Sequence, residues 1–109
     1  MTKQEAIDNH RQMWRWIAEK TRERRKVVHK IDYFNEAAQT IDIPKGRCWC
    51  CEYTLGIRGF CGACPIKWTG YYCFIGGSEY NMWLASTDND DWREAAHWAA
   101  VIAELPERL

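Results

Sequence analysis

The chain has no net charge and no long apolar run, and these two absences exclude several classes of protein. Its 109 residues contain 15 Lys and Arg against 15 Asp and Glu, so the whole protein lacks the positive excess that attracts nucleic acid. No apolar stretch approaches the roughly 20 residues of a membrane-spanning helix. The opening residues Met1–Glu5 carry no positively charged leader followed by an apolar segment. We therefore expect a soluble, cytoplasmic protein with no membrane partner.

Motifs that indicate catalysis are also missing. The sequence contains no phosphate-binding Gly-x-x-x-x-Gly-Lys and no His-Glu-x-x-His. None of its three histidines is followed two residues later by glutamate, as in a zinc-dependent nucleobase deaminase. Cys61 and Cys64 have the spacing of a thioredoxin-type dithiol, but the preceding residues 56–59 do not predict the strand that such a site follows. We interpret the protein as a non-enzyme.

Cysteine, in contrast, is abundant between positions 48 and 73, where all six cysteines lie. Four of them form two Cys-x-x-Cys pairs that are separated by nine residues, namely Cys48, Cys51, Cys61 and Cys64. Each two-residue gap lets both sulfurs of a pair reach one ion, and Zn²⁺ prefers a tetrahedral cage of thiolates. In a reducing cytoplasm clustered cysteines are metal ligands more often than disulfides. The spacing therefore predicts one structural zinc ion.

Three features leave alternatives open at this site. Cys73 can replace one of the four ligands or make a five-thiolate cluster in which one thiolate remains free, whereas Cys50 should point away from an ion that its neighbours share. The Cys64-Pro65 sequence is typical of the end of a bacterial ferredoxin run, so an iron–sulfur cluster is the alternative cofactor. A redox or electron-transfer role would require that cluster or a labile disulfide.

The remaining sequence predicts helices at both ends of a single domain, residues 1–109. A helix is expected over 3–26, where an apolar stripe includes His10, and a second short helix over 31–38. Residues 40–85 form the cysteine-rich, metal-binding region. Within it, residues 40–46 are expected to be extended and turn-like, and residues 48–80 are expected to be loops with one small hairpin at most. Candidate N-cap residues at 86–91 predict that the last helix begins there, within the C-terminal segment, residues 86–109. The expected fold class is α+β and mostly helical. The helical N-terminal segment, residues 1–39, and the C-terminal helix are expected to pack around a loop-rich, zinc-ribbon-like or zinc-knuckle-like centre.

Charge is unevenly distributed between the two halves of the chain. Residues 1–47 carry eleven basic and seven acidic residues, a net charge of +4, and residues 48–109 carry four and eight, a net charge of −4. The basic end of the first helix offers candidate phosphate contacts, namely Arg22, Arg24, Arg25, Lys26 and Lys30. Nucleic-acid binding is therefore an alternative function. A solvated helix end explains the same residues, because Glu19 and Glu23 dilute the charge.

Aromatic residues are more numerous than a core of this size requires, and seven of them are tryptophans. Several lie in or beside the cysteine-rich region and form a candidate partner-binding surface, namely Trp49, Trp68, Tyr71, Tyr72 and Trp83. The alternative is that these rings pack over the metal site and between the helices as part of the core.

Several short motifs together resemble a known group of proteins. In chain order they are Arg15-Trp16-Ile17-Ala18-Glu19, Cys48-Trp49-Cys50-Cys51-Glu52-Tyr53, Cys61-x-x-Cys64-Pro65-Ile66-x-Trp68, Tyr80-x-x-Trp83 and Ala103-Glu104-Leu105-Pro106. This pattern is similar to short, uncharacterised cysteine-rich proteins of phages and prophages of Gram-positive bacteria. The resemblance covers nearly the whole chain. It implies that five cysteines (48, 51, 61, 64 and 73) belong to one site and that Cys50 is incidental.

The resemblance also implies a function, that of a phage accessory protein in the host cytoplasm. Such a protein would act by binding, either to a host or defence protein or to a small signalling nucleotide that it sequesters. The sequence-based hypothesis is therefore a non-enzymatic zinc protein that inhibits or sequesters its partner.

Overall fold

Helices dominate the structure, as the sequence predicts. The computed structural model describes residues 2–38, 49, 64–69, 73 and 77–107. Four helices lie in these ranges, namely α1 (Lys3–Arg24), α2 (Lys30–Glu36), α4 (Glu79–Asp88) and α5 (Trp92–Ala103). Within the same ranges the extended structure amounts to one isolated antiparallel bridge between Ile66 and Glu107. None of these helices is long and apolar enough to cross a membrane.

Helix α1 is the longest element, and its ends have clear local causes. The Thr2 hydroxyl accepts a hydrogen bond from the Glu5 amide at 3.1 Å, which caps the first turn. The 22 residues that follow contain neither proline nor glycine, so the helix runs for about 33 Å. It ends where Arg25 adopts a left-handed conformation with φ of 54°. The predicted helix over 3–26 is thus confirmed to within two residues.

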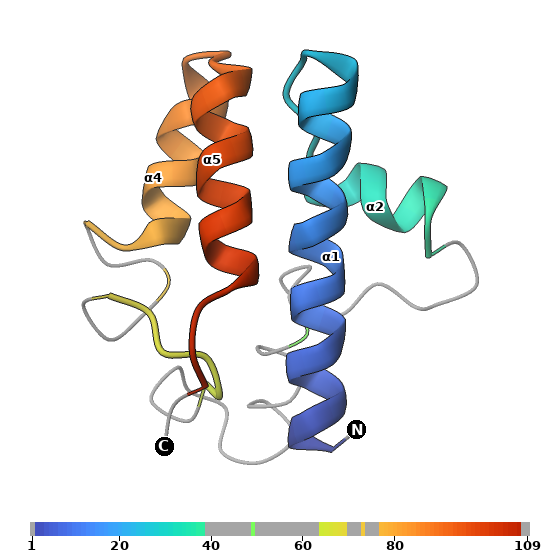
Figure 1. Ribbon diagram of the computed structural model, residues 1–109, viewed down its shortest axis with the longest axis vertical. Coiled ribbons are helices and arrows are strands. Elements are labelled where there is room, and N and C mark those ends of the chain that lie inside the picture. Colours follow the sequence, from blue (N-terminus) through green and yellow to red (C-terminus); the bar gives the residue numbers. More distant parts are fainter. Residues whose placement is uncertain (1, 39–48, 50–63, 70–72, 74–76, 108–109) are drawn as a thin grey trace.

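Helices α1 and α5 pack against each other, which confirms the predicted contact between the N-terminal and C-terminal helices. They run side by side in Figure 1, with α4 behind α5 and α2 on the other side of α1. Asp91 caps α5 by accepting a hydrogen bond from the Glu94 amide at 3.2 Å. Small alanines on the buried side of α5, including Ala95 and Ala99, allow the two helices to approach closely.

Helix α4 corrects the sequence-based prediction. The sequence predicts loops from Cys48 to Tyr80 and N-cap candidates for the last helix at residues 86–91. Instead Ser78 caps α4 by accepting from the Asn81 amide, and residues 86–88 form its last turn. The hydroxyls of Ser86 and Thr87 donate to helix carbonyls within α4, at 2.8 Å each. Their polar groups are therefore satisfied inside the helix, and they do not cap α5.

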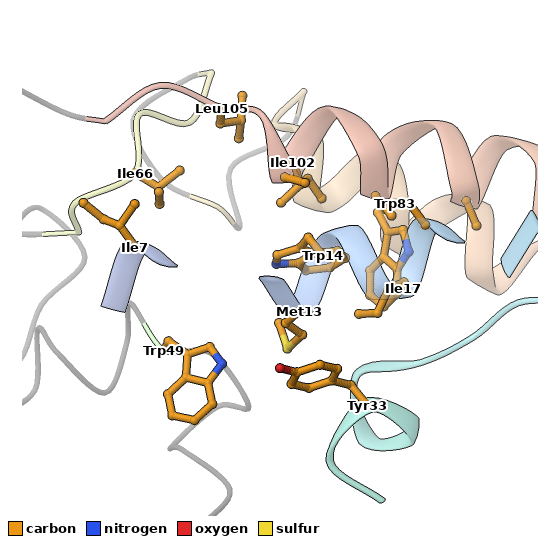
Figure 2. Packing of buried hydrophobic residues seen from close by; sticks show 14 of the residues in the cluster. Ile7, Met13, Trp14, Ile17, Tyr33, Trp49, Ile66, Trp83, Ile102 and Leu105 are labelled. Carbon is orange, nitrogen blue, oxygen red and sulfur yellow. The ribbon is translucent and has the colours of Figure 1, made fainter. Parts of the chain in front are cut away.

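One hydrophobic core joins the helices to the cysteine-rich region. Trp14 and Ile17 of α1, Trp83 of α4 and Ile102 of α5 meet in its centre (Figure 2). Ile66 from the cysteine-rich region belongs to the same core and is fully buried. The helical scaffold therefore fixes the position of at least one segment that carries a candidate metal ligand.

Candidate functional site

Two of the five candidate metal ligands lie in the described ranges of the chain. Cys64 and Cys73 are half-buried, and both pack against the hydrophobic core. The other candidates, Cys48, Cys51 and Cys61, lie outside the described residues, as does Cys50. Half-buried thiols at the edge of a rigid core have the donor chemistry and the restricted position that a thiolate metal site requires. Among the described residues, no group of three or more His, Cys, Asp or Glu side chains is placed to hold a metal ion, so the predicted ion is a matter for the proposal below.

The segment 64–69, which begins at Cys64, is held in place along the lower half of α1. Ile66 points toward Ile7 of α1 and lies below Leu105 (Figure 2). The Lys67 amide donates to the Pro106 carbonyl at 2.9 Å, beside the bridge between Ile66 and Glu107. These contacts fix the backbone that follows Cys64 against both termini of the described chain.

The N-terminus of α4 connects both cysteine-bearing segments. Glu79, which is 8% exposed, accepts hydrogen bonds from the Thr69 hydroxyl at 2.6 Å and from the Thr69 amide at 3.0 Å. The neighbouring Ser78 hydroxyl donates to the Cys73 carbonyl. Two adjacent residues of one helix end therefore hold the segment that follows Cys64 and the backbone of Cys73. The partners are ten and five residues apart in the chain, and no periodic pattern in the sequence indicates that they meet.

Glu79 is charged in the folded protein because of these hydrogen bonds. Burial alone raises the pKa of its carboxyl group. The hydrogen bonds from Thr69 and from the Glu79 amide outweigh burial and lower the pKa below its ordinary value. A buried carboxylate with satisfied oxygens is a firm anchor for the segment 64–69.

His10 is the one histidine in the core, and it is one of five buried side chains for which the described part of the chain supplies no hydrogen-bond partner. Its side chain is fully buried, and neither ring nitrogen has a hydrogen-bond partner among the residues that the structure describes. Its ring centroid lies 5.8 Å from that of Trp68, with the two planes nearly perpendicular, and 6.4 Å from that of Trp14. The sequence places His10 on the buried stripe of α1. Only the structure shows that its ring nitrogens have no hydrogen-bond partner in the described part of the chain.

Three of the five predicted partner-binding aromatics are core residues. Trp49, Trp68 and Trp83 are 6%, 5% and 2% exposed, so in this structure they do not form an open binding surface. Trp83 packs edge-on against Trp14 and stacks on Tyr80. These three rings lie in the core, as the alternative interpretation of the sequence has them. Tyr71 and Tyr72 lie outside the described residues.

The five predicted phosphate contacts fall into two groups. Arg24 forms a two-pronged ion pair with Glu36, and Lys30 donates to the Tyr80 hydroxyl at 2.8 Å. The pKa of Arg24 is raised above its ordinary value, and the hydrogen bond with Glu36 is the main cause. The three others are exposed and form no ion pair with an acid of the described ranges, namely Arg22, Arg25 and Lys26.

A shallow depression on the outer side of α1 was not predicted from the sequence. It encloses about 620 Å³ and is lined by side chains from three successive turns, namely Asp8, Arg11, Gln12, Arg15, Trp16 and Glu19. Arg11 donates to the Leu105 carbonyl at 3.2 Å and Arg15 pairs with Glu104 at 3.2 Å. Because each arginine carries five donors, both retain N–H groups for another partner. Trp16 is half-buried beside them.

Comparison of the chain with protein-family models, with curated proteins and with solved structures finds no match. What the protein does must therefore be inferred from its own residues.

Proposed function

We propose that the protein is a non-enzymatic zinc-binding protein that acts by binding a partner. One Zn²⁺ ion is held by Cys48, Cys51, Cys61 and Cys64, with Cys73 as the alternate ligand. The observation that supports this centre is the junction at the N-terminus of α4, where Ser78 and Glu79 hold both described cysteine-bearing segments. In this proposal the ion orders a zinc-ribbon-like or zinc-knuckle-like centre and holds it against the helices.

The metal has a physical role in a chain of this size. The sequence of residues 40–63 shows no hydrophobic periodicity, and a domain of about 100 residues has a limited core with which to offset the entropy of ordering such a segment. Structural zinc supplies folding free energy directly, because the site exists only in the folded chain. Four thiolates leave no open coordination position for a substrate, which is consistent with binding in place of catalysis.

The outer side of α1 is the surface that best supports partner binding. Arginine and tryptophan are enriched at the energetic centres of protein interfaces, and Arg11, Arg15 and Trp16 lie together there. Trp49, Trp68 and Trp83 are buried in the core and are not part of this surface. Resemblance to phage accessory proteins makes a host or defence protein the expected partner, or a small signalling nucleotide.

A pull-down with matched variants tests this function. Wild type, the double variant Arg11→Ala/Arg15→Ala and the control Arg93→Ala on α5 would each be used as bait in lysate of infected or prophage-carrying cells, followed by mass spectrometry. A partner that is captured by wild type and by Arg93→Ala, but not by the double variant, supports the proposal. Equal capture by all three baits would contradict the assignment of this surface. For the nucleotide alternative, the same three proteins are compared in thermal-shift assays with linear and cyclic nucleotides.

Nucleic-acid binding is a second candidate, favoured by the three exposed cations at the end of α1. Such binding would weaken steeply as salt is raised, because each phosphate contact releases counterions. Arg22→Ala/Lys26→Ala should then reduce the slope of that dependence. No mobility shift with duplex DNA or RNA at low salt would eliminate this candidate.

A further inference from the structure

We propose that the outer side of α1 binds an α-helix of a partner protein, and that this helix presents two acidic side chains one turn apart. The inference rests on the proposed function and names the kind of partner that the surface accepts. Arg11 and Arg15 contact the acidic side chains, and Trp16 packs against the same helix.

The first observation is that the depression on α1 is a groove between two rows of side chains of a single helix. Within each row successive residues lie four positions apart, and the rows are Asp8, Gln12 and Trp16 on one side and Arg11, Arg15 and Glu19 on the other. Helices pack by placing such a row of one helix into the groove of another. A small molecule is usually enclosed by its site, whereas this lining, which belongs to α1 alone, can contact a ligand from one side only. The shape therefore favours a helix over a nucleotide.

The second observation is the order of charges along the groove. From one end to the other the charged side chains are negative, positive, positive and negative, namely Asp8, Arg11, Arg15 and Glu19. Because the two arginines are separated by one helical turn, they match carboxylates that are separated by one turn on a second helix. Basic side chains further along that helix in both directions match Asp8 and Glu19. Such complementarity selects a partner by its charge pattern.

The same order of charges argues against a second copy of the chain as the occupant. If two α1 helices paired in antiparallel fashion through this groove, Arg11 would lie opposite Arg15 and Asp8 opposite Glu19. If they paired in parallel around a two-fold axis, each residue would lie opposite itself. Both arrangements bring like charges together, which opposes association. The occupant is therefore a different protein.

The third observation is that the groove can accept a partner at little cost. The ion pair between Arg15 and Glu104 is exposed, at 59% and 70% for the two side chains, and exposed pairs contribute little stability. Glu104 can therefore yield Arg15 to another carboxylate. The half-buried Trp16 ring is already held in place, because Tyr33 packs edge-on against it at 5.5 Å between centroids and the Arg24 guanidinium lies 5.7 Å from its centroid. An anchor that is fixed before binding loses little conformational freedom on binding.

Selection from a displayed library of single α-helical peptides, randomised on one face, tests the inference with the wild-type protein as bait. We expect enrichment of peptides that carry two acidic residues three or four positions apart with an apolar residue beside them. In NMR spectra, an enriched peptide should shift the signals of the Gln12 amide side chain and the Trp16 indole, and its affinity should fall as salt is raised. No enrichment, enrichment of basic peptides, or shifts confined to another part of the protein would overturn the inference.

Charge reversal gives an independent readout. Arg11→Glu/Arg15→Glu should bind the enriched acidic peptide roughly tenfold more weakly than wild type, because two exposed charge pairs become repulsive. It should bind more tightly than wild type to the same peptide with lysine in place of the two acidic residues. The control Arg22→Glu/Arg93→Glu makes the same change in net charge at exposed positions outside the groove and should leave the acidic peptide's affinity close to that of wild type. Equal affinities in the two double variants would contradict the inference, and if a variant does not fold, the selection on wild type decides.

Failure of this inference and failure of the proposed function give different results. If the pull-down depends on Arg11 and Arg15 but no helical peptide is selected, the binding surface is correct and the helical partner is not. A nucleotide that raises the Tm of wild type but not of Arg11→Ala/Arg15→Ala identifies a small molecule as the occupant and overturns the inference. A wild-type dimer in sedimentation that Arg11→Glu/Arg15→Glu dissociates identifies a second copy and also overturns it. Equal capture by all three baits of the pull-down overturns the surface and the inference together.

Discussion

The hydrogen bonds from Thr69 to Glu79 should contribute measurably to the free energy of unfolding. The substitution Glu79→Gln should remove part of this contribution. The glutamine keeps one carbonyl oxygen but presents an NH₂ group where the second carboxylate oxygen accepted a bond. A hydrogen bond to a charged group contributes about 1.5–3 kcal/mol. Glu79 is buried but Thr69 is exposed, so we expect a loss of about 2 kcal/mol. For a domain of this size that corresponds to a decrease in Tm of roughly 10 °C.

The pH dependence of this loss identifies its cause. The folded-state pKa of Glu79 lies below its ordinary value, so its contribution is fully present above the unfolded-state pKa of about 4.3. The contribution is lost as pH falls through the lower, folded-state pKa. The free-energy difference between wild type and Glu79→Gln should therefore be constant near neutrality and shrink below about pH 4. Urea unfolding at a series of pH values measures it.

Two further variants decide whether the reasoning is correct. Thr69→Val removes the hydroxyl donor and should reduce stability in wild type but much less in Glu79→Gln, because the two changes remove the same interaction. Glu94→Gln changes an exposed glutamate in the first turn of α5 and controls for the helix dipole, which contributes about 0.3–1 kcal/mol. If Glu79→Gln costs no more than Glu94→Gln, or if its cost does not depend on acid pH, Glu79 does not anchor the segment 64–69.

Other substitutions should have effects of different sign and size. Arg25→Gly should raise the free energy of unfolding by about 0.5 kcal/mol, because glycine adopts the left-handed conformation of this position without strain. Arg22→Gly, within α1, should lower it. If thermal unfolding shows the same sign for both variants, the conformation of Arg25 does not have this effect. Ile17→Ala should reduce the free energy of unfolding by about 2–5 kcal/mol, because Ile17 is fully buried. A loss below about 1 kcal/mol would mean that Ile17 is not in the core. Cys64→Ser should lower Tm and release zinc, whereas Cys50→Ser should do neither, and equal tolerance of both changes would contradict the predicted ligand set.

The helices that can be predicted from the sequence are those whose formation is visible in local patterns. For α1 and α5, an apolar stripe with the helical repeat predicts both elements and their contact, and polar N-cap candidates predict the start of α5. Helix α4 escapes prediction because its sequence has little separation between apolar and polar faces. Its residues Tyr80 and Trp83 pack against Trp14, and this tertiary contact, which no local pattern reports, favours the helix.

The candidate site is predictable only in its local features, for a similar reason. Ligand spacing follows from local chain geometry, so the Cys-x-x-Cys pairs can be recognised directly. The anchoring of Thr69 by Glu79 and the burial of His10 and Trp68 depend on segments that meet only in the folded chain. Exposure of an aromatic ring is likewise a property of the fold, and composition alone suggests a surface where the structure has a core.

Elemental analysis of folded protein, purified under reducing conditions, tests the central claim most directly. The expected result is one zinc ion per chain, no visible absorbance, and thiols that become reactive only after the metal is chelated. Iron in the protein together with a brown colour would show that the cofactor is an iron–sulfur cluster and not zinc. Folded protein without stoichiometric metal, or with these sulfurs joined to each other as disulfides, would contradict the account.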